Sequence, residues 1–365
     1  MKKIRIGILF GGRSGEHEVS LMSSKSVLSV LNPQKYEITE IGITQEGEWW
    51  SGTDTWQQFQ NKSFEGLYRV LLIPEPGKTI LYRHQEGRLD AITELDVIFP
   101  VLHGTFGEDG TLQGFFEMAD IAYVGAGVLG SSVGMDKALF KDVMRANDIP
   151  VVDWIVTSRN YAEQHIDEIV KETEALGAYP FFIKPANLGS SVGISKCKNR
   201  SDLMEGILEA CRFDRRILIE KGVEYTREIE ISVLGNENPR ASVPGEIKPA
   251  DEFYSYNAKY YNDRSELIIP APLSDEMIAQ MQAIAIRTYQ AIDCAGMARV
   301  DFLVNGQTNQ LFINEVNTIP GFTKISMYPK LWDACGLKYA DLVDELVNLA
   351  FERKAERNRS ERKLS

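Results

Sequence analysis

The stretch 297–330 constrains this chain most strongly, because it reads as two strands joined by a turn-rich loop and followed by a proline–glycine corner. Arg299 and Asp301 lie two positions apart, so on a strand they share one face. Glu315 and Asn317 have the same spacing. In a symmetric hairpin Asp301 lies opposite Glu315, and the same register places Arg299 opposite Asn317. A slip of one residue would send one pair to the other face.

This polar face has two interpretations. Alternating acidic and apolar residues are typical of the solvated face of an antiparallel sheet. Two carboxylates and an amide oxygen are also hard ligands that suit magnesium shared with a phosphate group, and an adjacent arginine suits a phosphoryl group or an oxyanion. The segment 317–323 turns the chain straight after this face and offers backbone N–H groups to an anion, which favours the second interpretation.

Length and composition narrow the class of protein. A chain of 365 residues favours two or three domains, and 44% apolar and 25% charged residues are ordinary for a soluble globular protein. The net charge of −12 argues against a nucleic-acid or membrane-surface binder, so a phosphate site must be a local basic cluster. The four cysteines are scattered without a C-x-x-C pair, which indicates neither a zinc site nor a disulfide scaffold and favours a cytoplasmic protein.

The first part of the chain predicts a small parallel α/β domain, because strands alternate with a glycine-rich loop and a helix. The strands are expected at 4–10, 36–43, 67–73 and 96–102, and the first helix is expected to end near residue 31. Glu16, at the start of that helix, either complements the helix dipole or holds an ammonium group. His103 lies in a loop at the carboxyl end of a strand, where such sheets place ligands, although an isolated histidine is more often structural.

A glycine motif at 125–130 matches G-x-G-x-x-G after an apolar strand. A dinucleotide-binding fingerprint needs a helix that starts there, within a βαβ unit. Here the motif lies at the end of the α/β region, and residues 131–134 are expected to prolong the loop. An interdomain linker is therefore the favoured interpretation.

The middle of the chain carries candidate phosphate ligands. Asp136 is expected to cap a helix whose first turn contains Lys137. The small-residue loop 186–194 either folds over phosphates or is only a glycine–serine hairpin tip, and Lys184 just before it favours phosphate. A Walker A loop is absent from the sequence.

Two later segments are distinctive. The polar, tyrosine-rich segment 249–266 predicts a lid that packs when it closes. The charged tail after residue 352 has little to bury and is expected to fray or to be disordered.

Eight short motifs, in order along nearly the whole chain, resemble those of D-alanine–D-alanine ligases, a family of the ATP-grasp superfamily. They are GGRSGEHEVS (11–20), HGTFGEDGTLQG (103–114), MDK (135–137), FIKPANLGSSVGISK (182–196), EK (220–221), AKY (258–260), GMARVDF (296–302) and INEVNTIPGFT (313–323). The resemblance implies a three-domain α/β ATP-grasp fold. Its parts would be a Rossmann-like N-terminal domain (1–134), a central α+β subdomain (135–222) and a C-terminal α+β subdomain (223–365) carrying the lid, with ATP sandwiched between the last two.

The resemblance also implies a reaction. The carboxylate of a first D-alanine would take the γ-phosphoryl group of ATP to give an acyl phosphate, which the amine of a second D-alanine would attack. The tetrahedral intermediate would collapse to D-alanyl-D-alanine, ADP and phosphate, and the dipeptide would serve peptidoglycan synthesis. A homodimer in the cytoplasm is implied by resemblance alone.

The site residues of the family carry over onto matching positions in this chain. Two magnesium or manganese ions would be held by Asp301, Glu315 and Asn317. ATP would be bound by Lys137, Lys184, Glu220, Lys221, Val223, Glu228 and Lys259. The two D-alanines would contact Glu16, His103, Arg299, Gly321, Ser326 and Met327. The residues expected to act in catalysis are Glu16, Ser190, Tyr260, Arg299 and Gly321, with Glu16, Ser190 and Tyr260 forming a hydrogen-bonded network across the lid.

Tyr260 bears on the substrate. Relatives that use D-lactate tend to have phenylalanine at this loop position, and Tyr261 follows directly, so either alignment favours the dipeptide. The alternative within the enzyme class is a D-alanine–D-lactate ligase or another ATP-grasp carboxylate–amine ligase. The alternative outside it is an inactive ATP-binding module, which the intact Arg299 and metal-ligand set argue against.

Overall fold

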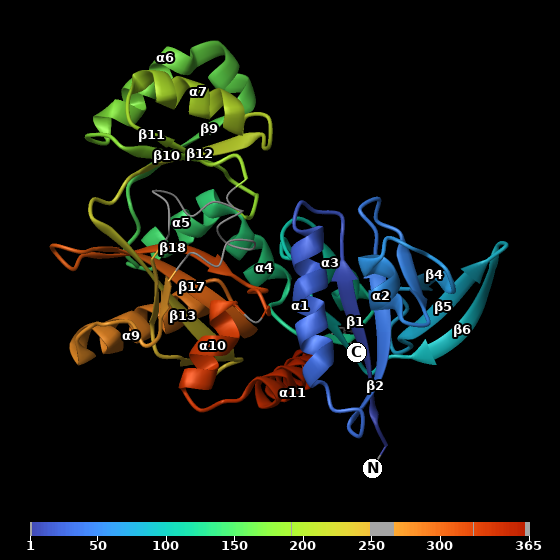
Figure 1. Cartoon of the computed structure of the whole chain (residues 1–365). Coiled ribbons are helices and arrows are strands. Elements are labelled where there is room, and N and C mark those ends of the chain that lie inside the picture. Colours follow the sequence, from blue (N-terminus) through green and yellow to red (C-terminus); the bar gives the residue numbers. More distant parts are fainter. Residues whose placement is uncertain (1, 191, 249–265, 324, 362–365) are drawn as a thin grey trace.

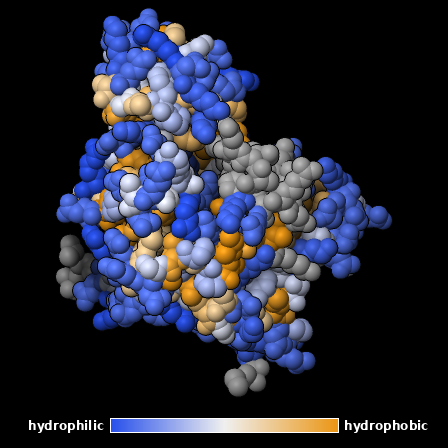
Figure 2. Space-filling model, turned by 60° about the vertical axis from the view of Figure 1, so that its left-hand side comes forward, coloured by the Kyte–Doolittle hydropathy of each residue, from blue (hydrophilic) through white to orange (hydrophobic). Residues whose placement is uncertain are grey.

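The computed structural model describes residues 2–190, 192–248, 266–323 and 325–361, which form three β-sheets with helices packed around them (Figure 1). The middle sheet and its helices form the upper lobe of this view, above the other two sheets. None of the helices in these ranges combines the length and apolar character that a membrane span requires. The face in Figure 2 is largely hydrophilic, and its apolar residues form separate patches.

The first sheet has eight strands in the order β6-β5-β4-β3-β2-β1-β7-β8. Its strands are β1 (Ile4–Gly11), β2 (Tyr36–Ile43), β3 (Trp49–Gly52), β4 (Leu67–Leu72), β5 (Ile80–Gln85), β6 (Arg88–Glu94), β7 (Val97–Pro100) and β8 (Ala122–Tyr123). The helices within this region are α1 (His17–Val30), α2 (Thr55–Gln60) and α3 (Thr111–Met118).

The prediction of a parallel sheet is confirmed for part of this region. β1 pairs in parallel with β2 and β7, and β7 pairs in parallel with β8. The strands β3 to β6 instead extend the sheet in antiparallel pairs. At the tightest turn, Glu86 and Gly87 have φ values of 51° and 76°, which is the geometry of a two-residue hairpin.

The middle sheet is antiparallel with the order β11-β10-β12-β9. Its strands are β9 (Trp154–Ser158), β10 (Phe181–Pro185), β11 (Ser195–Cys197) and β12 (Arg216–Lys221). The helices α6 (Arg159–Ala175) and α7 (Arg200–Ala210) cover one face of this sheet (Figure 1). The opposite face is therefore left to meet the other sheets.

The third sheet has the order β16-β15-β13-β17-β18, with β14 paired to β13. Its strands are β13 (Thr226–Gly235), β14 (Arg240–Ala241), β15 (Gly245–Lys248), β16 (Glu266–Ile268), β17 (Gly296–Asn305) and β18 (Leu311–Asn317). The helices that follow or pack against it are α5 (Lys137–Ala146), α9 (Asp275–Ala291), α10 (Met327–Ala334) and α11 (Tyr339–Arg357). As predicted, Asp136 caps α5, and its side chain accepts a hydrogen bond from the Leu139 N–H.

Polar and apolar side chains alternate along the central strands of the third sheet. The apolar set packs against α5 and α9, and it includes Ile229, Ile231, Ala298, Val300, Phe302 and Val316. The other face carries six polar side chains: Glu228, Glu230, Arg299, Asp301, Glu315 and Asn317. Burial of the apolar face fixes which side chains point to the polar one.

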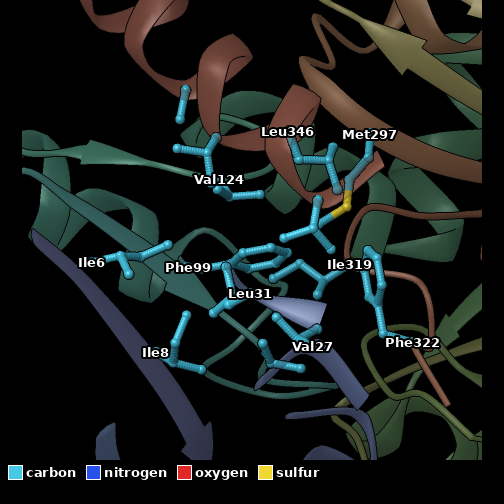
Figure 3. Close-up of a cluster of buried hydrophobic side chains, with 14 of the residues drawn as sticks. Ile6, Ile8, Val27, Leu31, Phe99, Val124, Met297, Ile319, Phe322 and Leu346 are labelled. Carbon is cyan, nitrogen blue, oxygen red and sulfur yellow. The ribbon is translucent and has the colours of Figure 1, made fainter. Parts of the chain in front are cut away.

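The first and third sheets share one hydrophobic core. Figure 3 shows Ile6, Phe99 and Val27 from the N-terminal region in one buried cluster with Phe322 and Leu346 from the C-terminal region. The ring centroids of Phe99 and Phe322 lie 5.8 Å apart. All of these side chains are buried. The predicted divisions at residues 134 and 222 stay a prediction, and this core joins the first predicted unit to the third.

The glycine motif at 125–130 does not extend a loop. Helix α4 (Val128–Met135) begins within it, so the prediction of a loop through residue 134 is wrong. A Cβ atom on Gly130 would lie 3.1 Å from the backbone of Cys294, and one on Gly134 would lie 3.0 Å from Thr318. The small residues therefore let this helix approach the third sheet closely.

The C-terminal helix also runs further than expected. Arg353 Nη2 donates a hydrogen bond to the carbonyl of Tyr123 at 3.3 Å, and Lys354 Nζ donates to the carbonyl of Asp120 at 2.5 Å. Arg357 pairs with the Asp120 carboxylate at 2.6 Å. The expectation of a frayed tail from residue 352 is thus wrong for the residues through Arg357, because their partners lie in the first region and not in the tail itself.

We predict that Arg357→Gln lowers the free energy of unfolding by about 1 to 2 kcal/mol, because it removes charge-assisted hydrogen bonds to Glu117 and Asp120 that are largely shielded from solvent. Urea denaturation measures the effect. The matched control is Arg359→Gln, whose side chain is 77% exposed and pairs with Glu356, three residues before it. That change is expected to cost less than about 0.5 kcal/mol, and equal losses in the two variants would contradict the proposed docking.

Candidate active site

The three sheets meet around a cavity of about 330 Å³. The first region contributes the start of α1 and the loop after β7, the middle sheet contributes β10 and β12, and the third sheet contributes its polar face and the corner after β18. The carboxyl ends of β1 and β7 thus open toward the same space as the polar face of β17 and β18.

Most residues predicted for the site line this cavity. They are Glu16, His103, Lys137, Lys184, Ser190, Glu220, Lys221, Val223, Glu228, Arg299, Glu315, Asn317, Gly321, Ser326 and Met327. Asp301 lies directly behind Arg299 and is 9% exposed. Lys259 and Tyr260, with most of the predicted lid, lie outside the described residues.

The hairpin register predicted from spacing is confirmed. Arg299 pairs with Asn317, and Asp301 pairs with Glu315. Beyond Asp301 the register shifts by one, so that Phe302 pairs with Ile313. This bulge leaves Asn314 as an extra residue, and it lines the cavity beside Glu315.

Arg299 is held by two carboxylates. Its Nε and Nη2 donate to Asp301 Oδ1 and Oδ2, both at 2.7 Å, and its Nε lies 3.0 Å from Glu230 Oε2. Burial alone would lower the pKa of Arg299, but Asp301 and Glu230 outweigh it and raise that pKa well above its usual value. The guanidinium is therefore a fixed positive charge facing the cavity.

Asp301, Glu315 and Asn317 offer the donor set that a divalent metal ion needs. Asn317 Nδ2 donates to Asp301 Oδ2 at 3.0 Å, and Lys137 Nζ lies 3.6 Å from Glu315 Oε2, so each carboxylate already faces a positive or donor group. Within the ranges that the structure describes, no three His, Cys, Asp or Glu side chains are close enough to hold a metal ion by themselves. Two carboxylates and an amide oxygen are the kind of donors that a magnesium ion shared with phosphate oxygens would take.

The basic side of the cavity comes from the middle region. Lys137 Nζ donates to the carbonyl of Leu188 at 2.8 Å, at the base of the small-residue loop. Lys184 Nζ lies 2.6 Å from Glu220 Oε2 and donates to Asn314 Oδ1 at 3.1 Å. Burial would raise the pKa of Glu220, but Lys141 and Lys184 outweigh it and lower that pKa to about 2. Glu220 is thus an anion between two lysines.

Glu16 occupies a slot between two glycines. A Cβ atom on Gly104 would lie 2.3 Å from Glu16 Oε2, and one on Gly189 would lie 2.7 Å from it. The Ser190 hydroxyl donates a hydrogen bond to Glu16 Oε1. The first loop and the small-residue loop of the middle region therefore meet at this carboxylate, and the predicted Glu16–Ser190 contact is confirmed.

His103 and Glu108 join the first region to the corner after β18. His103 Nδ1 lies 3.0 Å from the carbonyl of Ile319, and its Nε2 lies 2.9 Å from Ser23 Oγ. Glu108 accepts hydrogen bonds from the N–H groups of Gly104 at 2.8 Å and Ile319 at 2.9 Å. Burial lowers the pKa of His103, so the neutral ring is favoured.

The corner 318–326 is built around Ser326. Its hydroxyl accepts a hydrogen bond from the Thr323 N–H at 3.0 Å, and a Cβ atom on Gly321 would lie 2.7 Å from it. Ser326 also precedes the first residue of α10, Met327, whose N–H lies at a helix N-terminus. Gly321, Ser326 and Met327 are therefore adjacent, as the predicted substrate contacts require.

Sequence reasoning missed four charged or polar residues of this region: Glu108, Lys141, Glu230 and Asn314. Two of them carried a usable signal. Lys141 lies four positions after Lys137 and so on the same helix face, and Glu230 lies two positions after Glu228 on one strand. Asn314 reaches the cavity only because of the bulge, which spacing does not reveal.

Comparisons with known proteins agree with this geometry. The family model described as the D-ala D-ala ligase N-terminus matches residues 5–126, and the model described as the D-ala D-ala ligase C-terminus matches residues 143–348. A D-alanine–D-alanine ligase of Natranaerobius thermophilus is 48% identical over 99% of this chain and 98% of its own length. One from Thermoanaerobacter sp. is 49% identical over 96% of this chain and 98% of its own length.

Solved structures give the same result. A D-alanine-D-alanine ligase of Coxiella burnetii superposes with a TM-score of 0.83 at 36% identity, covering 98% of this chain and 97% of its own. The VanG D-Ala:D-Ser ligase of Enterococcus faecalis superposes with a TM-score of 0.84 at 34% identity, covering 96% of this chain and all of its own. The fold is that of the ATP-grasp enzymes. The chain belongs to the D-alanine–D-alanine ligase family.

The buried carboxyl group of Glu108 should make the folding stability depend on pH. Burial, with the nearby Glu16 carboxylate, raises the pKa of Glu108 from 4.5 to about 8. Because the folded state favours the protonated form, ionisation of Glu108 costs folding stability as pH rises through this interval, by at most about 1.4 kcal/mol per pKa unit. Glu108→Gln is always neutral and escapes that cost.

We therefore expect the variant to gain stability relative to the parent protein between pH 5 and pH 8.5. Urea denaturation at several pH values measures the difference. Glu86→Gln, an exposed change in the β5–β6 turn, controls for the substitution itself. A stability difference between Glu108→Gln and the parent that does not vary with pH would contradict the assignment of a raised pKa.

Proposed function

We propose that this protein joins two D-alanine molecules in an ATP-dependent reaction that yields D-alanyl-D-alanine, ADP and phosphate. One observation carries the proposal. Lys137 and Lys184 of the middle region face Glu315 and Asn317 of the third sheet across one cavity, which has Glu16 at its other end. Family membership supports the same reaction.

The lysines and the small-residue loop would bind the triphosphate of ATP. Transfer of a phosphoryl group between anions depends mainly on charge neutralisation and alignment, and less on covalent participation by the protein. Lys137 and Lys184 supply positive charge, and the loop after Leu188 supplies donors. Glu220, Lys221, Val223 and Glu228 also line the cavity, and the adenosine would fit beside them.

Magnesium or manganese ions would be held by Asp301, Glu315 and Asn317, together with oxygens of ATP. When bound, they would neutralise phosphate charge during transfer. Arg299 is already anchored by Asp301 and Glu230, so its position does not depend on the substrate. It would stabilise the oxyanion of the tetrahedral intermediate, with the N–H of Gly321 as a second donor.

The two amino-acid subsites would lie at opposite ends of the cavity. Glu16, in its glycine slot, would bind the ammonium of the first D-alanine, with His103 beside it. Ser326 and the Met327 N–H would receive the carboxylate of the second, at the N-terminus of α10. We also propose that Tyr260 closes over this site, and that the enzyme acts as a homodimer in the cytoplasm for peptidoglycan synthesis.

A coupled assay of phosphate release tests the proposal. With ATP and magnesium, we expect release with D-alanine, little with L-alanine, and a preference for D-alanine over D-lactate and D-serine as second substrate. Mass spectrometry of the product separates dipeptide from depsipeptide. Preference for D-lactate or D-serine would assign another member of the carboxylate–amine ligases. Binding of ATP without turnover of any D-amino acid would indicate an inactive module.

The slot around Glu16 gives a sharper expectation. Gly104 has a φ of 73°, and an added Cβ would lie 2.3 Å from Glu16 Oε2, so Gly104→Ala must displace that carboxylate. We expect KM for D-alanine to rise about tenfold or more, as for loss of a charge-assisted hydrogen bond, while KM for ATP changes little.

Gly87→Ala is the matched control. Gly87 has a φ of 76°, but nothing lies within 4 Å of its added Cβ. It carries the same backbone strain without touching the site, so we expect a loss of stability with unchanged kinetic constants. If both variants bound D-alanine as the parent does, Glu16 would not be the ammonium ligand.

A further inference from the structure

Lys141 is a buried lysine next to the nucleotide region, and its role is not explained by the reaction. It lies on α5, one turn after Lys137, and is 1% exposed. It is not among the described residues that line the cavity, so it cannot touch a ligand there directly. A lysine is rarely buried to this degree unless a charge partner compensates it.

The partner of Lys141 is Glu220. Lys141 Nζ lies 2.8 Å from Glu220 Oε1, while Lys184 Nζ lies 2.6 Å from Glu220 Oε2. The carboxylate is thus bracketed by two ammonium groups, one facing the cavity and one behind it. Trp154 closes the rear, with its ring centroid 5.8 Å from Lys141 Nζ and 3.7 Å from the guanidinium carbon of Arg145.

The balance of charge in this cluster depends on Lys141. With both lysines protonated, the cluster of Lys141, Glu220 and Lys184 has a net charge of about +1, since one carboxylate faces two ammonium groups. Burial lowers the pKa of Lys141, and the adjacent Glu220 carboxylate opposes that shift. Without Lys141, Glu220 and Lys184 would form a neutral pair, and Glu220 Oε1 would lose its counter-charge in a buried place. Lys184 Nζ would then be drawn toward both carboxylate oxygens and away from Asn314.

We propose that Lys141 is a positioning residue for the nucleotide: it binds one oxygen of Glu220, so that Lys184 keeps its place and its excess positive charge for the phosphates. This inference rests on the proposed binding of ATP in the cavity. It assigns Lys141 no contact with substrate. Its effect on Lys184 passes through Glu220.

The test measures ADP affinity by isothermal titration calorimetry, together with KM for ATP and for D-alanine. In Lys141→Met, which has similar volume and no charge, we expect ADP affinity to fall about tenfold or more. That is the size expected when the charge-assisted hydrogen bond of Lys184 to a phosphate oxygen is lost. KM for ATP should rise in parallel, and KM for D-alanine should stay within about twofold.

The matched control is Lys171→Met on α6, which removes the same charge from an exposed position of the middle region. It should leave ADP affinity and both KM values unchanged. Thermal unfolding of each variant reports whether lost stability accompanies lost affinity. A purely structural role for Lys141 would lower the melting temperature and leave ADP affinity intact, which would overturn the proposal.

A double-mutant cycle with Glu220→Gln further separates a positioning role of Lys141 from a purely structural one. If Lys141 acts through the Glu220 carboxylate, adding Lys141→Met to Glu220→Gln should cost no additional ADP affinity, because no anion remains to be compensated. An additive loss would contradict the proposal. If Lys141→Met alone does not fold, the proposal can still be tested by comparing the ADP affinity of Glu220→Gln with that of the double variant.

The proposed function and this inference fail in different ways. If the parent protein binds no ADP, the assignment of the cavity to a nucleotide is wrong. If the parent binds ADP and Lys141→Met binds it equally well, the cavity assignment stands and the role of Lys141 is wrong.

Discussion

The register between β17 and β18 is the constraint on which the rest of the site depends. One face of these strands is buried against α5 and α9, so a slip of one residue would bury Asp301 and Glu315 in an apolar core and expose Val300 and Val316. Hydrophobic burial, and not attraction between polar groups, therefore decides which side chains face the cavity. The polar groups then arrange themselves on a face that the core has already selected.

Charge compensation across the cavity is the second constraint. The middle sheet presents lysines, and the third sheet presents carboxylates that are themselves anchored, as Arg299 anchors Asp301 and Glu230. Arg299, Lys141, Lys184 and Glu220 each have a partner of opposite sign, and the cost of removing them from water is offset locally. Lys137 pairs with Glu315, and Lys184 with Asn314, between the middle region and the third sheet. A bound triphosphate and its cations would therefore be enclosed by groups whose orientation is set before binding.

Much of this arrangement could be predicted from the local sequence. The parts that could not be predicted each have a physical cause. Period-two spacing placed Arg299 with Asp301, and Glu315 with Asn317, on one face, and the assumption of a symmetric hairpin gave the pairing of Asp301 with Glu315 that the structure has. It could not predict Asn314, since a bulge changes the period without a composition signal. The sequence predicts a loop where helix α4 forms. Its glycines are there because they allow close packing against residues more than 150 positions away, which the local sequence does not show. The contacts of Arg357 with the N-terminal region could not be predicted from the local sequence either, since its partners are far away in the chain.

The core shared by the first and third sheets contains residues from early and late parts of the chain, and this affects the order in which the core can form. Leu342, Leu346 and Val347 of the last helix complete the apolar layer beneath β1 and α1. During synthesis the N-terminal sheet therefore emerges well before the helix that covers it, and it stays uncovered or partly protected until α11 has left the ribosome. Contacts between residues so far apart in the sequence favour slow folding.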